Sequence, residues 1–357
     1  MAKRTPLYSE HQKLNARFTE FGGWDMPVFY SSIIEEHHAV RTHAGLFDTS
    51  HMGEFLVSGP NSVPFMENLV PGSMADLPAG KARYTQLLNE EGGIVDDLIV
   101  YRRGHDFLLV VNASNSDKDL AWINDHKTPG VTVEDISDRI CLLALQGPGA
   151  EKILQPLVRE DLKSIGSFHF ISAIFNTAAS EFSIVARTGY TGEDGFEIFL
   201  SPEAAGPIWQ KLIEAGAVPC GLGCRDTLRL EACMPLHGND IDDKTTPLEA
   251  ELNWTIVWGK EFLGKDALLN QKCTGIQRHF AAFILESGIP RSHCDIVVEG
   301  KKAGMVTSGT FSPTLKKGIG IGYTDHKLEP GQKIGVVVHG QTKSADVVKK
   351  PFYKRKK

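Results

Sequence analysis

Hydrophobic and polar positions along residues 93–103 predict a strand that carries an acid on each face. Ile94–Tyr101 is an apolar, β-branched run that follows the turn signal of two consecutive glycines. Because strand side chains alternate in direction, Asp96 and Asp97 point to opposite faces, each among apolar neighbours. Aspartate is depleted in strands, and an unpaired buried carboxylate is costly. An acid that faces a core is therefore expected to have a specific role.

Strand and helix patterns follow one another over the first 274 residues without the strict alternation of a parallel α/β fold. The clearest helix pattern covers residues 32–45, where Ser32 and Glu35 fit a capping box and Gly45 can end the helix. The other predicted strands cover residues 53–60, 82–88, 106–113, 141–147 and two runs within 182–200 around a Gly-rich loop, and the other predicted helices cover 61–72, 117–126, 149–158, 201–217 and 223–232.

The pattern changes after about Gly275 to short β runs separated by glycine and lysine turns. These runs occupy residues 293–309, 318–325 and 333–349. Such a pattern is typical of a compact all-β domain, either a barrel or a sandwich. The chain ends in a basic tail, which is a solvated surface in most proteins but could also steer an acidic partner.

Composition and charge exclude several classes of protein. The 357 residues, 41% hydrophobic and 23% charged, are typical of a globular protein of two or three domains. A net charge of -6 gives no general attraction for nucleic acid or an anionic membrane. No apolar run reaches the roughly 18 residues of a membrane-spanning helix, and the first residues lack the apolar stretch of a secretory signal. We therefore expect a cytoplasmic protein.

Cysteine and histidine positions give little support for a metal site. The six cysteines form no CxxC pair, and their low density does not suggest a disulfide scaffold. Cys220 and Cys224 could form half of a metal site, but no second half has suitable spacing. The histidines at 37, 38, 43 and 51 form no HExxH pattern. We expect packed, reduced thiols and hydrogen-bonded or surface histidines.

The loop TGYTGEDG, residues 188–195, lacks the Lys-Ser/Thr pair of a phosphate-binding P-loop, and its two acids would repel phosphate. It is either a plain hairpin loop or one whose glycines allow close approach to a flat ligand, with Tyr190 able to stack. Glu197 follows on the strand face opposite Phe196 and could point into a polar pocket.

The predicted helix at 223–232 carries Arg225, Asp226, Arg229 and Glu231. It is either a salt-bridged surface helix or a helix in which the guanidinium of Arg225 donates paired hydrogen bonds to a ligand carboxylate. Nucleophile-elbow, Walker A and Rossmann motifs are absent from the sequence. The residues alone favour an enzyme or a binder of a small, flat, anionic ligand.

Several longer stretches together resemble the T-protein family of the glycine cleavage system, which are aminomethyltransferases. They run in family order over essentially the whole chain: RTPLYSEHQKLNARFTEFGGWDMPV, EEHHAVRTHAGLFDTSHMGE, GGIVDDLIVY, ALQGP, RTGYTGEDGFEI, PCGLGCRDTLRLEACMPLHGNDID, TPLEAELNW and VTSGTFSPTL. The resemblance implies an α+β fold of three domains in a cloverleaf around a central folate channel, with an all-β C-terminal barrel or jelly-roll-like domain. The implied domains are 1–50 with 137–225 and about 245–274, then 51–136 with about 226–244, and finally 275–357.

Members of this family transfer the methylene carbon of an aminomethyl group from the lipoyl arm of the H-protein to tetrahydrofolate. The products are methylenetetrahydrofolate, ammonia and dihydrolipoyl H-protein. The resemblance therefore implies tetrahydrofolate as co-substrate, no metal, and lipoylated H-protein as partner, with neither nucleic acid nor membrane involved.

The resemblance also implies roles for individual residues. Asp96 matches the essential acid, which can relay a proton and stabilise iminium-like charge. Glu197 matches an acid that accepts the paired donors of the pterin edge, and Asp97 is expected to be structural or hydrogen-bonded. The implied folate-binding residues are Tyr84, Asp96, Leu98, Tyr190, Glu197, Arg225 and, in the tail, Arg355.

Three positions depart from the family pattern. Cys224 and Cys233 stand where Ala or Gly is typical, and His237 stands where Tyr is common, which is expected to alter packing beside the pocket.

Three other functions compete with this one. Folate-dependent demethylases share the fold, but the complete GYTGEDG and RDTLRLEA stretches favour the glycine-cleavage role. The branch that maintains iron–sulfur clusters carries a KGCYxGQE-like signature where this chain reads TTPLEAELNW. A folate-binding module without catalysis is disfavoured by the intact Asp96.

Overall fold

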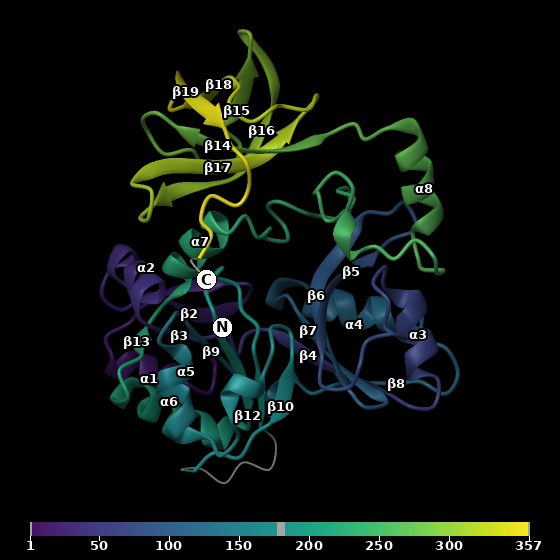
Figure 1. Cartoon of the computed structure of the whole chain (residues 1–357), viewed down its shortest axis with the longest axis vertical. Coiled ribbons are helices and arrows are strands. Elements are labelled where there is room, and N and C mark those ends of the chain that lie inside the picture. Colours follow the sequence, from purple (N-terminus) through teal and green to yellow (C-terminus); the bar gives the residue numbers. More distant parts are fainter. Residues whose placement is uncertain (1, 177–182, 356–357) are drawn as a thin grey trace. The chain divides into compact units, whose positions relative to one another are not determined.

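The protein is described by a computed structural model that covers residues 2–176 and 183–355 (Figure 1). The chain divides into two compact units. The first comprises Met1–Thr85 and Asp97–Arg225, and the second comprises Gln86–Asp96 and Asp226–Lys357. The chain passes between the units inside two strands, β5 (Ala82–Leu88) and β6 (Ile94–Arg103), and inside helix α7 (Leu222–Glu231).

A six-stranded sheet in the first unit has the order β10-β11-β12-β9-β3-β13. Neighbouring strands are antiparallel except β13 and β3, which are parallel. The pair β11 and β12 confirms the two strands predicted around the Gly-rich loop, although residue 182 lies outside the described residues. The strands are β3 (Gly45–Asp48), β9 (Cys141–Gln146), β10 (Phe170–Ser172), β11 (Ile184–Ala186), β12 (Gly195–Leu200) and β13 (Val218–Pro219).

A second sheet has the order β5-β6-β7-β4-β8, with β4 at Gly53–Ser58, β7 at Asp106–Val111 and β8 at Thr132–Asp135. Side chains of β6 and β7 pack with those of β9 and β12 in one buried cluster, in which the rings of Tyr101 and Phe199 lie edge to face at 5.2 Å. A two-stranded sheet, β1 (Arg17–Phe21) with β2 (Trp24–Phe29), completes the strands of the first unit.

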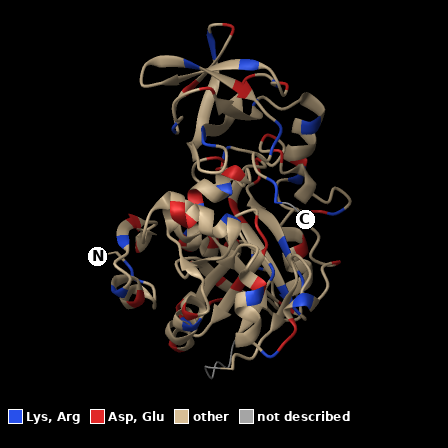
Figure 2. Cartoon of the chain, turned by 60° about the vertical axis from the view of Figure 1, so that its left-hand side comes forward, with Lys and Arg blue, Asp and Glu red and all other residues tan. Residues whose placement is uncertain are grey.

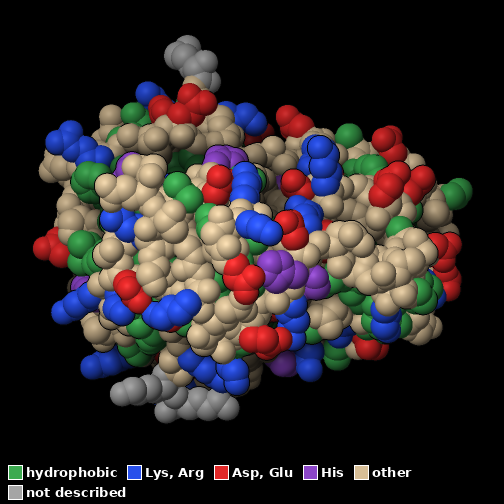
Figure 3. Space-filling model, turned by 90° about the horizontal axis from the view of Figure 1, so that it is seen from above, with side chains coloured by type: hydrophobic (Ala, Val, Ile, Leu, Met, Phe, Trp, Pro, Cys, Tyr) green, Lys and Arg blue, Asp and Glu red, His purple; other side chains and the backbone are tan. Residues whose placement is uncertain are grey.

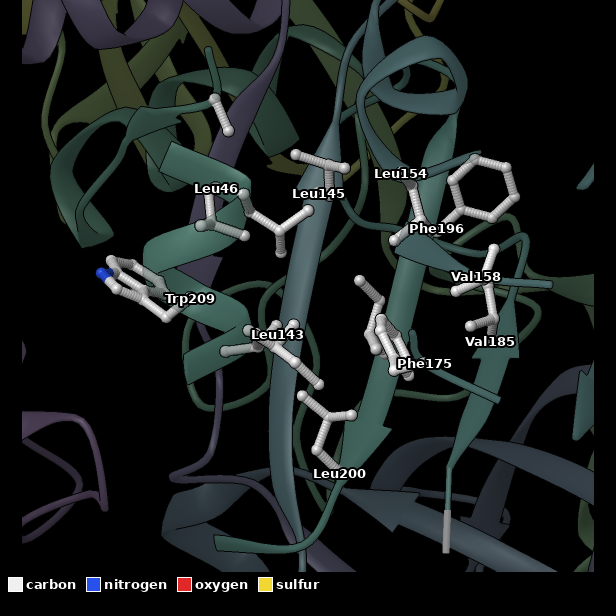
Figure 4. Close-up of a cluster of buried hydrophobic side chains, with 14 of the residues drawn as sticks. Leu46, Leu143, Leu145, Leu154, Val158, Phe175, Val185, Phe196, Leu200 and Trp209 are labelled. Carbon is white, nitrogen blue, oxygen red and sulfur yellow. The ribbon is translucent and has the colours of Figure 1, made fainter. Parts of the chain in front are cut away.

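Helices pack against these sheets. Trp209 of α6 is fully buried with leucines from β3, β9 and β12 (Figure 4), so this cluster fixes the six-stranded sheet that carries Glu197. The α-helices are α1 (Tyr8–Lys13), α2 (Ile33–Thr42), α3 (Ser62–Leu69), α4 (Ser116–Asp125), α5 (Ala150–Leu154), α6 (Pro202–Glu214), α7 and α8 (Lys265–Thr274), and the short 3-10 turns are Ala113–Asn115, Ser137–Arg139, Gln155–Leu157, Leu162–Ser164 and Asn253–Thr255.

The start of α2 confirms the predicted cap, because the Ser32 side chain accepts the backbone N–H of Glu35 at 3.2 Å. The predicted end is wrong. The helix ends at Thr42, and Gly45 is instead the first residue of β3. A side chain at Gly45 would place its Cβ 2.3 Å from Val40 Cγ2 and 2.7 Å from Cys220 Sγ. This glycine therefore allows close packing and does not terminate the helix.

The C-terminal part of the second unit is a closed barrel with the order β14-β17-β16-β15-β18-β19, in which every pair is antiparallel. This confirms the predicted all-β domain and identifies it as a barrel. Its strands are β14 (His279–Leu285), β15 (Asp295–Val298), β16 (Lys301–Ser312), β17 (Lys317–Thr324), β18 (Lys333–Val338) and β19 (Gln341–Val347).

The mixture of helices and sheets confirms the α+β class, while the three-domain boundaries and the cloverleaf around a channel stay predictions. Acidic and basic residues are interspersed along the chain and on the face shown by the space-filling view (Figures 2 and 3). Among the described residues, no helix has the length and apolar character needed to span a membrane.

Candidate active site

The two acids of β6 have different environments. Asp96 is 0% exposed on a face with buried Ile94 and Leu98, whereas Asp97 is only half-buried on the other face. The Asp97 carboxylate accepts hydrogen bonds from the Tyr84 hydroxyl at 2.9 Å and from the Asn112 side-chain amide at 2.9 Å. Asp97 is therefore hydrogen-bonded, in agreement with the sequence interpretation. The two acids therefore differ in burial, and Asp96 is the one that is wholly buried.

His237, which follows α7 in the second unit, faces Asp96. Its Nδ1 lies 3.9 Å from Asp96 Oδ1, and its Nε2 lies 3.1 Å from the carbonyl oxygen of Ile94. The His237 side chain is only 8% exposed. The sequence interpretation expected this histidine only to alter packing, and its place beside the acid was missed.

Glu197 on β12 is held by two hydroxyl groups of the first unit. Its Oε2 accepts hydrogen bonds from Thr188 at 2.5 Å and from Tyr101 at 3.1 Å. Burial, and next the charge of Glu197, raise the pKa of Tyr101 well above its usual value, so this hydroxyl stays a donor. Within the described residues, Glu197 Oε1 accepts no hydrogen bond. One carboxylate oxygen is therefore left to accept from a ligand.

Arg225 near the start of α7 lies over the ring of Tyr190, with 4.8 Å between its Cζ and the ring centroid. Its guanidinium forms neither a hydrogen bond nor an ion pair with any residue that the structure describes. Desolvation lowers the pKa of Arg225, and nearby Tyr190 and Glu197 act in the opposite direction. A half-buried cation without a counter-ion is suited to bind an anionic group.

The rest of α7 resembles the salt-bridged helix that sequence analysis weighed against a ligand site. Arg229 pairs with Asp226 at 2.8 Å and with Asp240 at 2.7 Å, and it donates to Ser308 at 2.9 Å. These partners lie in the second unit and bind the helix to the barrel within that unit. The ion pairs predicted for this helix are therefore present, although Arg229 is buried and not at the surface, and the role of Arg225 toward a ligand stays a prediction.

The loop at residues 188–195 is held by the protein itself. Glu193 pairs with Arg41 at 3.0 Å, and Asp194 accepts two bonds from Arg187, at 2.9 and 2.5 Å. A Cβ at Gly189 would lie 2.0 Å from Gln146 Oε1, so this glycine allows close approach to a protein side chain. The two acids of the loop are thus used in its folding, and its aromatic residue Tyr190 is presented beside Arg225.

The remaining predicted site residues are Leu98 and Arg355. Leu98 is 2% exposed on the Asp96 face of β6, and Arg355 is exposed in the tail. The tail is tied to α7 within the second unit by the backbone N–H of Tyr353, which donates to Glu231 O at 2.8 Å. The structure brings Tyr190, Glu197 and Arg225 together in one unit, and it brings Asp96 and His237 together in the other.

Glu36, Cys220 and Cys224 form a buried group whose possible metal-ligating atoms lie within 4.8 Å of one another. The Glu36 carboxylate already accepts backbone N–H groups from Tyr30, Ser31 and Gly221, at 2.6, 3.1 and 2.9 Å. Both thiols donate to backbone carbonyls, and burial raises the pKa of Cys224 well above its usual value. The group behaves as a hydrogen-bonded junction rather than as a prepared metal site.

Two further polar groups of the first unit are buried without a hydrogen-bond partner among the described residues, His51 Nδ1 and both carboxyl oxygens of Glu54. Desolvation, followed by the charge of Arg225, lowers the pKa of His51 to about 4, so its ring is neutral. Desolvation raises the pKa of Glu54 well above its usual value, so this acid holds its proton.

Two family models match most of the chain. The family model described as the GCVT N-terminal domain matches residues 7–260, and the glycine cleavage T-protein C-terminal barrel domain matches residues 278–354. This chain belongs to the glycine cleavage T-protein family.

Relatives resemble the T-protein chain over its whole length. The aminomethyltransferase of Geobacillus thermodenitrificans is 46% identical over 366 aligned residues, covering 100% of both chains. That of Rubrobacter xylanophilus is 47% identical and covers 99% of this chain and 95% of its own. The crystal structure of glycine cleavage system aminomethyltransferase T from Bartonella henselae matches with a TM-score of 0.93 and 34% identity, covering 99% of both chains.

Proposed function

We propose that this T-protein transfers the methylene carbon of an aminomethyl group from the lipoyl arm of H-protein to tetrahydrofolate. Its family membership makes it an aminomethyltransferase of the glycine cleavage system. The donor and the acceptor are the proposed part, with methylenetetrahydrofolate, ammonia and dihydrolipoyl H-protein as products. The proposal needs no resident metal. A cytoplasmic location is also proposed, in line with a cysteine pattern that suits reduced thiols.

The observation that carries the proposal is the wholly buried carboxylate of Asp96 near the start of β6. Its neighbour Asp97 is half-buried on the other face and accepts hydrogen bonds from Tyr84 and Asn112, so the two acids have different environments. As a folate nitrogen attacks the methylene carbon, Asp96 would take up or relay the proton that the nitrogen loses. The same negative charge would stabilise the iminium-like character that develops as ammonia leaves.

Recognition of the pterin ring is proposed for Glu197. A pterin edge presents an amino group beside a ring N–H, and both are donors. Because Oε2 already accepts two hydroxyl hydrogen bonds, we assign these ring donors to Oε1. A charge-assisted bond of this kind is shorter and stronger than a neutral one.

The other predicted residues would complete the folate site. Tyr84 and Tyr190 offer aromatic faces, Leu98 offers an apolar surface, and Arg225 offers a cation without a counter-ion among the described residues. Arg355 in the exposed tail is assigned to the glutamate carboxylates of folate.

The test is incubation of the full-length protein with aminomethylated H-protein and tetrahydrofolate, followed by assay of released ammonia. We expect Asp96→Asn to lower turnover by about 10²- to 10⁴-fold, which is the usual contribution of a general acid–base group, while tetrahydrofolate still binds. Asp97→Asn is the matched control. We expect it to raise the KM for tetrahydrofolate more than it lowers kcat, because it weakens the hydrogen bond that holds the Tyr84 hydroxyl. Near-normal turnover of Asp96→Asn would remove the central role assigned to this acid.

A further inference from the structure

His237 is anchored to the strand that carries the proposed catalytic acid. Its Nε2 lies 3.1 Å from the carbonyl oxygen of Ile94, two residues before Asp96 on the same face of β6. A carbonyl oxygen only accepts hydrogen bonds, so Nε2 carries a proton in this arrangement. Nε2 is thereby the anchored nitrogen, and Nδ1 is the nitrogen that faces Asp96.

The segment that carries His237 is itself fastened to β6. The backbone N–H of Ile94 donates to the carbonyl oxygens of Asp242 and Thr245, at 3.1 and 3.0 Å. The side-chain amide of Asn89, in the turn before β6, donates to the carbonyl of Asp243 at 2.8 Å. All of these residues belong to the second unit. The imidazole is therefore oriented by the fold, before any ligand arrives.

The second ring nitrogen is directed at the acid. Nδ1 lies 3.9 Å from Oδ1 of Asp96, and the two side chains are 8% and 0% exposed. This distance is too long for a direct hydrogen bond but within the range of an electrostatic interaction between the ring and the carboxylate. With a proton on Nδ1 the ring attracts Oδ1, and without it the lone pair of Nδ1 repels that oxygen. In either state the ring favours some orientations of the carboxylate over others.

We propose that His237 is a positioning residue for Asp96, held through Nε2 by the Ile94 carbonyl so that Nδ1 fixes the orientation of the carboxylate for aminomethyl transfer. The inference rests on the proposed function, because His237 acts through the acid that performs the chemistry. A histidine that served only to anchor the loop would need Nε2 alone, so the test must address Nδ1.

Three substitutions separate the two ring nitrogens. His237→Gln keeps an N–H donor near the place of Nε2 and loses the group facing Asp96. His237→Asn keeps an amide near the place of Nδ1 and loses the anchor. His237→Phe keeps the ring shape and removes both nitrogens. His339→Asn, at an exposed turn of the barrel with a left-handed backbone that Asn also adopts, is the control.

The readout is the separation of kcat from KM in the ammonia-release assay, with tetrahydrofolate affinity measured independently. We expect kcat to fall by up to about 100-fold in His237→Phe and His237→Gln, as for a catalytic group displaced by about 1 Å. We expect His237→Asn to recover part of this loss, and His339→Asn to match the wild type. Tetrahydrofolate affinity should stay near the wild-type value in all four variants.

Nuclear magnetic resonance of ¹⁵N-labelled histidine rings gives a readout that a purely structural role would not change. We expect Asp96→Asn to shift the Nδ1 resonance of His237 while its Nε2 resonance, set by the Ile94 carbonyl, stays in place. An unchanged Nδ1 resonance overturns the inference. A wild-type kcat in His237→Phe and His237→Gln, in the same assay in which Asp96→Asn is inactive, also overturns the inference. Full activity of Asp96→Asn instead overturns the role proposed for Asp96 in the transfer.

Discussion

Replacing Glu197 by Gln tests the proposed pterin contact at a single oxygen. The hydroxyl groups of Thr188 and Tyr101 donate to Oε2, so the amide oxygen of Gln is expected to take that position. The amide NH₂ group then occupies the position of Oε1 and faces the donors of the pterin ring. The substitution therefore exchanges an ionic acceptor for a donor at the ligand side and keeps both hydroxyl bonds.

The size of the effect follows from the bond that is lost. A hydrogen bond to a charged group contributes about 1.5–3 kcal/mol, which corresponds to roughly a 10- to 150-fold change in Kd. We expect Glu197→Gln to weaken tetrahydrofolate binding by this factor and to leave the melting temperature close to the wild-type value. The affinity can be measured by fluorescence quenching under anoxic conditions, with thermal unfolding followed in parallel.

Glu203→Gln is the matched control. Glu203 is exposed on α6, so this substitution makes the same chemical change away from the site. A Kd of Glu197→Gln within about threefold of the wild-type value, in a folded protein, would refute the assignment of Oε1 to the ligand. A large loss of thermal stability would instead contradict the claim that both hydroxyl bonds survive.

Three other outcomes are expected. Arg225→Met should weaken tetrahydrofolate binding by about 10- to 100-fold in the same assay, because it removes a cation whose anion would be supplied by the ligand; equal affinity would contradict this role. Glu54→Met should raise the free energy of unfolding in urea by about 1–3 kcal/mol near neutral pH, since it removes a buried acid without a partner among the described residues. Because the pKa of Glu54 is raised in the folded state, the wild-type protein loses stability as pH rises above the usual carboxyl range. The stability that Glu54→Met gains over the wild type should therefore be larger at about pH 8 than at about pH 5. A stability gain that does not change with pH would refute the raised pKa of Glu54. Association with lipoylated H-protein should weaken as salt increases if the basic tail steers docking, and an affinity and association rate that do not change with ionic strength would exclude that role.

Local patterns were sufficient to predict most elements of the fold. Alternation predicted β6 and separated its two acids by face, and the cap at Ser32 predicted the start of α2. Glycine was ambiguous, because the same residue serves as a helix stop and as a site of close packing. At Gly45 the packing partner Cys220 is far away in the chain, and no local pattern reveals it.

The partners of the site residues could not be predicted for the same physical reason. His237 and Ile94 are separated by 143 positions, and Glu197 and Tyr101 by 96, so their contacts depend on how strands and loops are brought together. The sequence could nominate Asp96, Glu197 and Arg225 by residue type and family resemblance. It could not indicate that Glu197 has one oxygen engaged, or that a histidine faces Asp96.

Because Arg225 has no ion-pair partner among the described residues, we expect the stability of this protein to depend on the anion that it binds. A ligand that supplies the missing anion adds RT ln(1 + [L]/Kd) to the free energy of unfolding, or about 2.7 kcal/mol when its concentration is 100 times Kd. The melting temperature therefore reports how much of the protein has ligand bound, and the measurement requires neither turnover nor H-protein. Reduced folates and their antagonists could be ranked by the rise in melting temperature alone, and in Arg225→Met the part of that rise due to this cation should disappear.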